Sequence, residues 1–247
     1  GDAFSPAALA KLAALDAAKL PAVSGSPRLG APVGGSPKFI AIGLNFADHA
    51  AESGLPTPAE PVVFMKANNA LCGPHDDVEK PRGSTKLDWE VELAVVIGTR
   101  AKYVSEADAL KYVAGYAVCN DVSERNFQIE RGGNWTKGKS HDTFGPLGPW
   151  LVTADEVGDV QKLDMWLDVN GQRRQTGSTA TMIFNVAQIV SYLSGMMTLM
   201  PGDVITTGTP PGVGMGMKPQ PQFLNAGDVM TLGIAKLGEQ RQKVVAA

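Results

Sequence analysis

Three carboxylates stand at the ends of two strand-like runs, and together they could bind a divalent cation. Residues 87–98 read LDWEVELAVVIG, and residues 115–125 read GYAVCNDVSER. Because side chains two apart in a strand share one face, Glu90 and Glu92 point the same way at the start of one apolar run, and Asp121 ends the other. Carboxylates buried together repel one another and lose hydration unless a positive charge lies between them. An oxygen-preferring cation meets this need, with Mg²⁺ expected and Mn²⁺ or Ca²⁺ as alternatives.

Composition argues for a globular enzyme. The chain has 247 residues, 44% of them hydrophobic, and a net charge of −3, which gives no electrostatic basis for binding nucleic acid or anionic membrane. We find no apolar run of about 18 residues and no signal-peptide pattern at the start. Cys72 and Cys119 are too few for a disulfide framework. These features predict a cytoplasmic location and no membrane partner.

The elements that must hold the carboxylates are mostly strands. Residues 5–20 predict a helix with Ser5 as N-cap and Pro6 in the first turn, and a Pro/Gly/Ser linker follows to residue 37. Beyond it, strand-like runs alternate with glycine and proline turns without regular βαβ alternation, and Asn170-Gly171 predicts a type I′ hairpin. We therefore expect a mixed, β-rich α+β fold. Because the chain opens in a helical pattern, residues 1–37 are interpreted as the remnant of a longer N-terminal region.

From residue 38 onward the chain resembles the fumarylacetoacetate hydrolase superfamily. The resemblance rests on seven segments in the family's order, namely GLNFADHAAE (43–52), DWEVELAVVIG (88–98), GYAVCNDVSERNFQ (115–128), KGKSHDTFGPLGPW (137–150), VNGQRRQTGST (169–179), PGDVITTGTPPGVG (201–214) and GD (227–228). It implies a β-sandwich-like roll with peripheral helices over residues 38–247, a homodimer, and Glu90, Glu92 and Asp121 as metal ligands. The segment DWEVELAVVIG and the loop TTGTPPGVGMG look like those of bacterial members that hydrolyse 2,4-diketo acids or acylpyruvates.

The expected chemistry begins with a 2-oxo carboxylate that chelates the metal. Three protein carboxylates leave about three of the six positions of Mg²⁺ for water or substrate. The ion would act as a Lewis acid on the keto oxygen, where negative charge develops when the bond at C3 breaks. We expect hydrolysis of the C3–C4 bond of a 2,4-dioxo acid, either an acylpyruvate or a sugar-derived 2,4-diketo-3-deoxy acid, with pyruvate leaving as its enolate.

Two further sets of side chains are candidates for proton transfer. His49 and Glu52 stand three apart, so that on a helix the carboxylate could orient the imidazole as a base for water. Alone, this spacing favours an incidental pair, and the resemblance reverses that preference. Lys139 could place a cation at the enolate or protonate C3, with Lys137 as the alternative. Removing Glu90 should abolish metal binding and leave the fold intact or more stable, because like charges are relieved.

The remaining candidates would bind substrate. Arg125 and Gln128 follow Asp121 at intervals that fit one helical face, and they could hold distal polar groups, although surface positions are the alternative. Thr209 lies in a glycine-rich loop that could cradle a carboxylate. Asn45 and Lys66 are lesser candidates.

Other reactions fit the same site. Decarboxylation of an oxaloacetate-type acid and isomerisation of a 2-hydroxy-dienoate share the enolate. Only hydrolysis needs a base-activated water. A catalytically silent metal-binding protein is the alternative from a different class.

Overall fold

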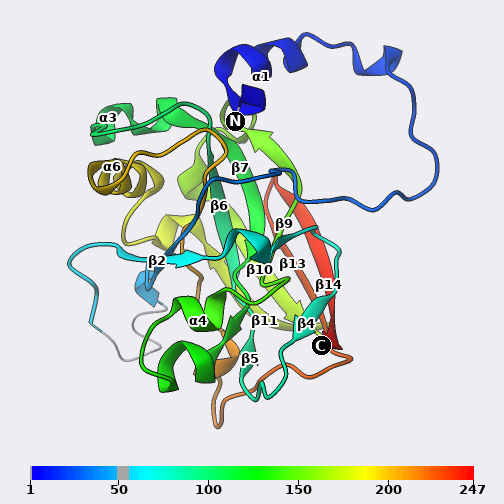
Figure 1. Cartoon of the computed structure of the whole chain (residues 1–247), viewed down its shortest axis with the longest axis vertical. Coiled ribbons are helices and arrows are strands. Elements are labelled where there is room, and N and C mark those ends of the chain that lie inside the picture. The colour runs from blue at the N-terminus through cyan, green and yellow to red at the C-terminus, as the bar shows by residue number, and fades with distance from the viewer. Residues whose placement is uncertain (1, 49–55) are drawn as a thin grey trace.

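A twisted seven-stranded sheet forms the centre of the molecule (Figure 1) in the computed structural model, which describes residues 2–48 and 56–247. Its strands follow the order β2-β1-β12-β6-β7-β9-β3. Their bounds are β1 (Phe39–Gly43), β2 (Val62–Lys66), β3 (Leu71–Cys72), β6 (Val91–Ile97), β7 (Val113–Asn120), β9 (Gly145–Thr153) and β12 (Val204–Thr206). The pairs β1–β12 and β3–β9 are parallel, whereas β6 and β7 at the centre pair antiparallel.

A second sheet of five strands packs on one face of the first. Its order is β11-β10-β13-β14-β4, with bounds β4 (Val78–Lys80), β10 (Asp164–Val169), β11 (Gln172–Ser178), β13 (Val229–Ile234) and β14 (Gly238–Ala246). Asn170 and Gly171 join β10 to β11 with φ values of 52° and 74°, as a type I′ turn requires, so this prediction is confirmed. A short pair, β5 (Leu87–Asp88) and β8 (Ser123–Glu124), lies beside the ends of β6 and β7.

The hydrophobic core fills the space between the two large sheets. In β6, Leu93 and Val95 face this core together with Leu232 of the second sheet. Ala94 and Val96 face the opposite side, where a smaller apolar cluster includes residues of the N-terminal segment. Since side chains alternate along a strand, Glu90 and Glu92 point toward the side that faces away from the second sheet. Both faces of β6 are buried, which explains its nearly continuous apolar sequence.

Helices lie at the periphery, as predicted. Among the described residues the α-helices are α1 (Pro6–Ala13), α3 (Glu106–Ala109), α4 (Thr136–Lys139), α5 (Ala154–Val157) and α6 (Val186–Met196). Asn185 and Gln188 form a capping box at the start of α6. Shorter turns are η1 (Asp2–Phe4), η2 (Ala17–Lys19), η3 (Asn68–Ala70), η4 (Leu110–Tyr112), η6 (Val160–Lys162), η7 (Thr179–Thr181), η8 (Gly214–Gly216) and a π-helical turn, η5 (Asn126–Glu130).

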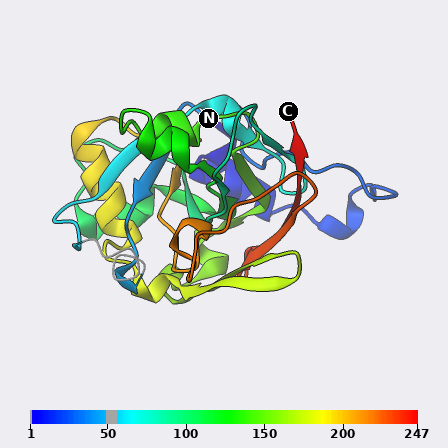
Figure 2. The ribbon, with the colours of Figure 1, turned by 90° about the horizontal axis from the view of Figure 1, so that it is seen from below.

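The N-terminal helix is shorter than its sequence predicts. Ser5 caps α1 by accepting from the N–H of Ala8, as expected, but the helix ends at Ala13 rather than near residue 20. Leu15 and Leu20 are more than half exposed, and Figure 2 shows the following segment extending away from the sheets. Without tertiary packing, helix propensity alone does not sustain another turn or two. The division at residues 37 and 38 stays a prediction.

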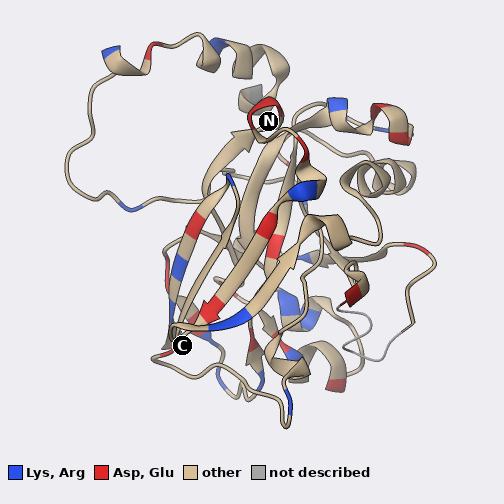
Figure 3. Ribbon diagram, turned by 180° about the vertical axis from the view of Figure 1, so that it is seen from behind, with Lys and Arg blue, Asp and Glu red and all other residues tan. Residues whose placement is uncertain are grey.

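Basic and acidic residues are distributed along the described chain, and Figure 3 shows both kinds interspersed along the ribbon. Among the described residues, no helix has the length and apolar character needed to cross a membrane. The mixed, sheet-rich architecture agrees with the fold class predicted from the sequence.

Candidate metal centre and active site

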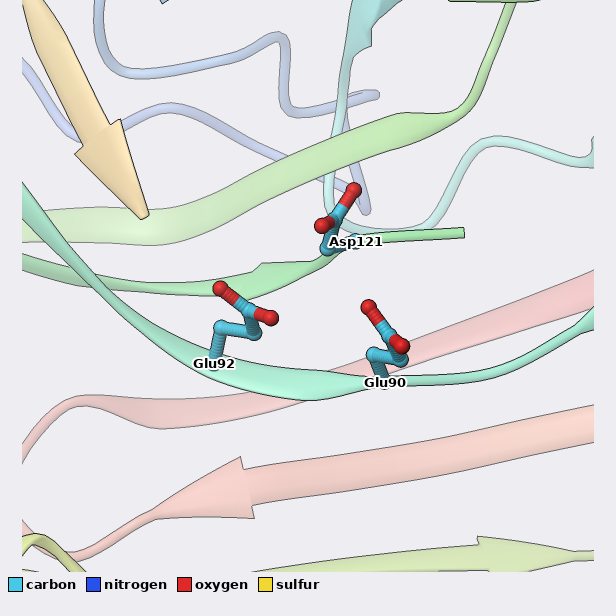
Figure 4. A group of neighbouring side chains, drawn as sticks. All are labelled: Glu90, Glu92 and Asp121. Atoms are coloured by element: carbon cyan, nitrogen blue, oxygen red, sulfur yellow. The ribbon is translucent and has the colours of Figure 1, made fainter. Parts of the chain in front are cut away.

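The three predicted metal ligands lie together because of the register between β6 and β7. Val91 pairs with Asn120, and the N–H of Asp121 donates to the carbonyl oxygen of Glu90 at 2.9 Å. Glu90 and Asp121 therefore lie opposite each other where the paired strands end, and Glu92 follows on the same face. Carboxylate oxygens of the three side chains lie within 4.8 Å of one another, and all three residues are buried. Figure 4 shows the carboxylates converging on one space.

A buried ammonium group bridges two of these carboxylates. Lys139 Nζ lies 2.5 Å from Glu90 Oε2 and 2.7 Å from Asp121 Oδ2. Lys139 is the last residue of α4, and this helix approaches β8 closely because residue 138 is glycine. A Cβ on Gly138 would lie 2.4 Å from a carbonyl oxygen of β8. Lys137 is exposed and donates to a backbone carbonyl, so Lys139 is the lysine of this segment that lies in the site.

Two more cations hold the outer oxygens of the same carboxylates. Arg125 Nη2 lies 2.7 Å from Glu90 Oε1, and its Nε lies 2.8 Å from Asp88 Oδ2. Lys66 Nζ lies 2.5 Å from Asp121 Oδ1 and is fully buried. Burial lowers the pKa of Lys66 more than Asp121 raises it. For Lys139 the neighbouring carboxylates overcome burial and raise the pKa.

The two glutamates of this centre have different electrostatic environments. Burial raises the pKa of both side chains. For Glu90 the charges of Arg125 and Lys139 outweigh burial and lower the pKa to about 2. For Glu92, burial and the negative charges of Asp121 and Glu90 hold the pKa well above its ordinary value, although the N–H of Gly208 donates to it at 2.8 Å. In the absence of a metal, the Glu92 carboxyl therefore takes up a proton more readily than an ordinary glutamate.

This donor set fits a hard divalent cation. Four buried carboxylates, those of Asp88, Glu90, Glu92 and Asp121, face only three cations, Lys66, Arg125 and Lys139, which leaves an excess of one negative charge when all four are ionised. A divalent ion among the last three carboxylates would change the excess from negative to positive, and an anionic substrate would neutralise it. A carboxylate offers about four lone-pair sites, so the existing hydrogen bonds leave room for metal coordination.

A cavity of about 300 Å³ opens above the carboxylates. Its floor contains Glu90, Glu92 and Asp121 together with Lys139. Its walls are largely apolar and come from β1, β2, η5, the start of α4 and the segment at η8; they include Ile42, Leu44, Phe64, Ile129, Trp135 and Met215. Phe64 and Trp135 contact each other edge to face, with ring centroids 5.3 Å apart. A ligand with one polar end and one apolar end is therefore complementary to this cavity.

The sequence reasoning on Arg125 and Gln128 needs correction. A helical face running from Asp121 was expected, but β8 intervenes and the π-helical turn begins at Asn126. Both side chains do line the cavity. However, Arg125 donates to carboxylates and, through Nη1, to Gln128 Oε1 at 3.1 Å, so its guanidinium is engaged with the protein.

Thr209 and the two lesser candidates, Asn45 and Lys66, also have protein partners. Thr209 lines the cavity, but its hydroxyl donates to the Val91 carbonyl at 2.9 Å, and a carboxylate cradle formed by this hydroxyl is not what the structure shows. Asn45 joins two loops, because its amide donates to the carbonyls of Thr207 and Phe184. Lys66 lies behind Asp121. Neither Asn45 nor Lys66 is among the residues that line the cavity.

Sequence reasoning missed two buried side chains that border the centre. Gln175 of β11 accepts from the Val91 N–H at 3.0 Å and donates to Thr209 Oγ1 at 2.8 Å, so the second sheet holds the backbone between the two glutamates. Asp88 pairs with Arg125. A signal existed for Asp88, since it precedes Glu90 by the same two-residue interval that separates Glu90 from Glu92. Gln175 lies in the segment 169–179 that contributes to the family resemblance, but no spacing in the sequence relates it to the glutamates.

The predicted base and its orienting carboxylate, His49 and Glu52, lie outside the described residues. Their roles stay predictions. Gly43 and Leu44, which precede them in the chain, line the cavity.

The chain belongs to the fumarylacetoacetate hydrolase family. A family model described as "Fumarylacetoacetate (FAA) hydrolase C-terminal" matches residues 38–245. A protein of Burkholderia cenocepacia that carries the name "Putative hydrolase" is 65% identical over 243 residues, which cover 98% of this chain and 86% of that protein.

Two solved structures with named activities share the fold. The 2-hydroxyhepta-2,4-diene-1,7-dioate isomerase of Mycobacterium marinum is 38% identical with a TM-score of 0.77, over 88% of this chain and 77% of that one. The maleylpyruvate hydrolase of Sphingobium sp. SYK-6, solved with manganese(II) and pyruvate, is 34% identical with a TM-score of 0.74, over 88% of this chain and 74% of that one.

Proposed function

We propose that this protein is a divalent-metal-dependent hydrolase that cleaves the C3–C4 bond of a 2,4-dioxo acid and releases pyruvate. One observation carries the proposal: carboxylate oxygens of Glu90, Glu92 and Asp121 lie within 4.8 Å of one another at the floor of a cavity with apolar walls. The maleylpyruvate hydrolase described above adds support, because its structure holds manganese(II) and pyruvate. Mg²⁺ is the ion we propose for this chain, with Mn²⁺ as a substitute.

A bound cation would supply Lewis acidity to the 2-keto oxygen of the substrate. The protein supplies the remaining functions. Glu90, Glu92 and Asp121 would hold the ion, and Lys139 adds a fixed positive charge beside the keto oxygen, where negative charge develops. The apolar residues Phe64, Trp135 and Met215 would exclude water around the acyl tail and thereby strengthen these interactions.

The proposed reaction balances as a hydrolysis. His49, oriented by Glu52, takes a proton from water, and the water oxygen bonds to C4. The C3–C4 bond then breaks, and its electron pair moves through C3 onto the oxygen at C2 to give the pyruvate enolate. A proton delivered to C3, for which Lys139 is the proposed donor, gives pyruvate, and the acyl part leaves as a carboxylic acid.

The panel that tests this proposal measures pyruvate release from acylpyruvates and from 2,4-diketo-3-deoxy sugar acids. Each reaction is run with Mg²⁺, with Mn²⁺ and with excess EDTA, and Glu92→Gln protein serves as the matched inactive control. We expect pyruvate and the carboxylic acid in equal amounts, only when metal is present. Mn²⁺ binding without turnover of any compound would instead identify a catalytically silent protein.

Isomerisation of a 2-hydroxy-dienedioate is the second candidate function, favoured by the similarity to the M. marinum isomerase. It needs proton transfer along the carbon chain and no water. The same panel therefore includes such a dienoate, followed by ultraviolet absorbance, and oxaloacetate, followed by loss of CO₂. Conversion of the dienoate much faster than any pyruvate release would favour the isomerase.

A further inference from the structure

Asp88 connects the metal centre to one wall of the cavity. This side chain is fully buried and belongs to the short strand β5, just before the two glutamates. Its Oδ2 accepts from Arg125 Nε at 2.8 Å, and the same guanidinium reaches Glu90 Oε1 through Nη2 at 2.7 Å. Asp88 thus fixes the arginine that orients a predicted metal ligand.

The same carboxylate also holds the backbone of the η8 turn, which is more than 120 residues away in sequence. Asp88 Oδ1 accepts from the N–H of Gly214 at 2.7 Å, and Oδ2 accepts from the N–H of Met215 at 3.0 Å. Met215 and the next residue, Gly216, line the cavity. A fourth bond, from the Trp89 N–H at 2.8 Å, fixes the carboxylate on its own strand.

All four partners of Asp88 are donors, so the carboxylate is used only as an acceptor. Such a group is not replaceable by an amide, because the amide nitrogen that Asp88→Asn introduces would face at least one N–H donor. Hydrogen bonds from a charged pair are also roughly twice as strong as neutral ones. Asp88 does not touch the space among Glu90, Glu92 and Asp121, so any effect on that space passes through Arg125.

We propose that Asp88 is a positioning residue that sets two features at once: the orientation of Glu90 toward the metal, through Arg125, and the place of the η8 wall against the substrate tail, through two backbone N–H groups. This inference rests on the metal site proposed above. Losing a partner that orients a metal ligand typically weakens metal affinity or activity 10- to 100-fold. The two hydrogen bonds from the η8 backbone to Asp88 add a separate effect on substrate binding.

The experiment compares Asp88→Asn, Arg125→Lys and the double variant. Lysine keeps the positive charge of Arg125 but has a single nitrogen, which cannot replace the two separate nitrogens that bridge Asp88 and Glu90. Mn²⁺ affinity is measured by calorimetry on metal-free protein. We expect each single variant to lose about 10- to 100-fold in Mn²⁺ affinity. The double variant should lose little more than either single one, because both changes break the same bridge.

Hydrogen exchange distinguishes the contact of Asp88 with Arg125 from its contacts with the η8 backbone. In metal-free protein, residues 213–217 should exchange faster in Asp88→Asn than in the wild type, whereas Arg125→Lys should leave them unchanged. KM for the substrate should accordingly rise more in Asp88→Asn than in Arg125→Lys. Asp203→Asn is the matched control, since Asp203 is equally buried, pairs with Lys38, accepts from the Met200 N–H and is not among the residues that line the cavity.

The outcomes distinguish this inference from the proposed function. No Mn²⁺ binding by the wild type would overturn the metal site itself. Wild-type Mn²⁺ affinity in folded Asp88→Asn, or fully additive losses in the double variant, would overturn the positioning role alone. If Asp88→Asn does not fold, Arg125→Lys tests the effect of the Asp88–Arg125–Glu90 bridge on metal binding. Unchanged Mn²⁺ affinity in Arg125→Lys would show that the bridge is unnecessary.

Discussion

The ammonium nitrogen of Lys139 lies 2.5 Å from a carboxylate oxygen of Glu90, with both side chains almost completely buried. A cation in direct contact with a predicted metal ligand neutralises part of the negative charge that a metal ion would otherwise neutralise. It also reaches the second ligand strand, since the same nitrogen contacts Asp121. These two contacts hold the lysine at the floor of the cavity.

Lys139→Met should separate stability from catalysis. Removing one partner of a buried ion pair costs about 3–5 kcal/mol, because the carboxylates lose a cation without gaining water. We expect a lower Tm in EDTA that Mn²⁺ largely restores, with Mn²⁺ affinity equal to or above that of the wild type. Turnover should fall by about 10²–10⁴ even with saturating metal. A variant that keeps more than half of the wild-type kcat would remove Lys139 from the chemistry.

Glu90→Gln and Glu92→Gln should change the stability of the metal-free protein in opposite directions. The pKa of Glu90 is lowered from 4.5 to about 2, so its loss should destabilise the fold by about 3 kcal/mol. The pKa of Glu92 is raised by burial and by its acidic neighbours, so its loss should raise the Tm in EDTA. Both variants should lose Mn²⁺ binding. Thermal melts in EDTA test the signs, and equal shifts would contradict this electrostatic description.

The cations around the two glutamates are the part of the site that local sequence does not predict. The two-residue interval between Glu90 and Glu92 correctly indicates one face of one strand, and the family's segments correctly indicate the fold. The cations that contact the carboxylates lie far from them in sequence; Lys66, for example, is 55 positions from its partner Asp121. From the sequence alone, relief of like charges predicts that removing Glu90 leaves the protein equally or more stable. The structure gives this carboxylate two cationic partners, Arg125 and Lys139, so we expect its removal to destabilise the metal-free protein instead.

Local sequence also fails where tertiary contacts decide the backbone. The spacing of Arg125 and Gln128 suggested one helix, but Ser123 and Glu124 pair with β5 instead. The helix expected to residue 20 ends at Ala13 because nothing packs on the next turn. Each difference arises from a contact that is distant in sequence or absent.

His49→Ala tests the assignment of the base that activates water. We expect hydrolysis to fall by about 10²–10⁴, the usual range for loss of a general base. Any decarboxylation of oxaloacetate should fall less, because that reaction needs no activated water. Rates of both reactions at saturating Mn²⁺ are the measurement. Losses of the same size would show that His49 serves both reactions in another way.

His141 should make stability depend on pH below neutrality. Its ring lies between Phe127 and Phe144, with centroid distances of 5.3 and 5.1 Å, and burial lowers the pKa of the imidazole below 6.5. Glu124 and Asp142 oppose this shift, and Lys66 reinforces it.

A histidine with a depressed pKa contributes its full stability above its ordinary pKa and loses it as the pH falls through the lowered value. The glutamine in His141→Gln stays neutral at every pH, so the Tm of this variant should fall less between pH 7 and pH 5 than the Tm of the wild type. Melts in EDTA keep metal binding out of the comparison. A steeper loss in the variant would reverse the sign and contradict the argument.

Gly43→Ala should change substrate binding without changing metal binding. Gly43 ends β1 and lines the cavity, and a Cβ there would lie 2.4 Å from Trp135 Cζ3, so the indole must move. Because Trp135 forms part of the apolar wall that we assign to the substrate tail, we expect KM to rise about 10-fold, the effect of a misplaced methyl-sized group in a pocket. Mn²⁺ affinity should stay at the wild-type value.

Gly195→Ala provides the control, since a Cβ at this position of α6 meets no atom of the described residues within 4 Å beyond its own helix backbone. It should leave KM unchanged and stabilise the helix by about 0.5–1 kcal/mol.

In Gly43→Ala, displacement of the Trp135 ring could instead shift Lys139, because Trp135 directly precedes α4. The two effects are separable: a shifted Lys139 lowers kcat at unchanged KM, whereas a displaced wall raises KM at nearly unchanged kcat. A loss confined to kcat would therefore show that Trp135 supports the lysine rather than the substrate tail.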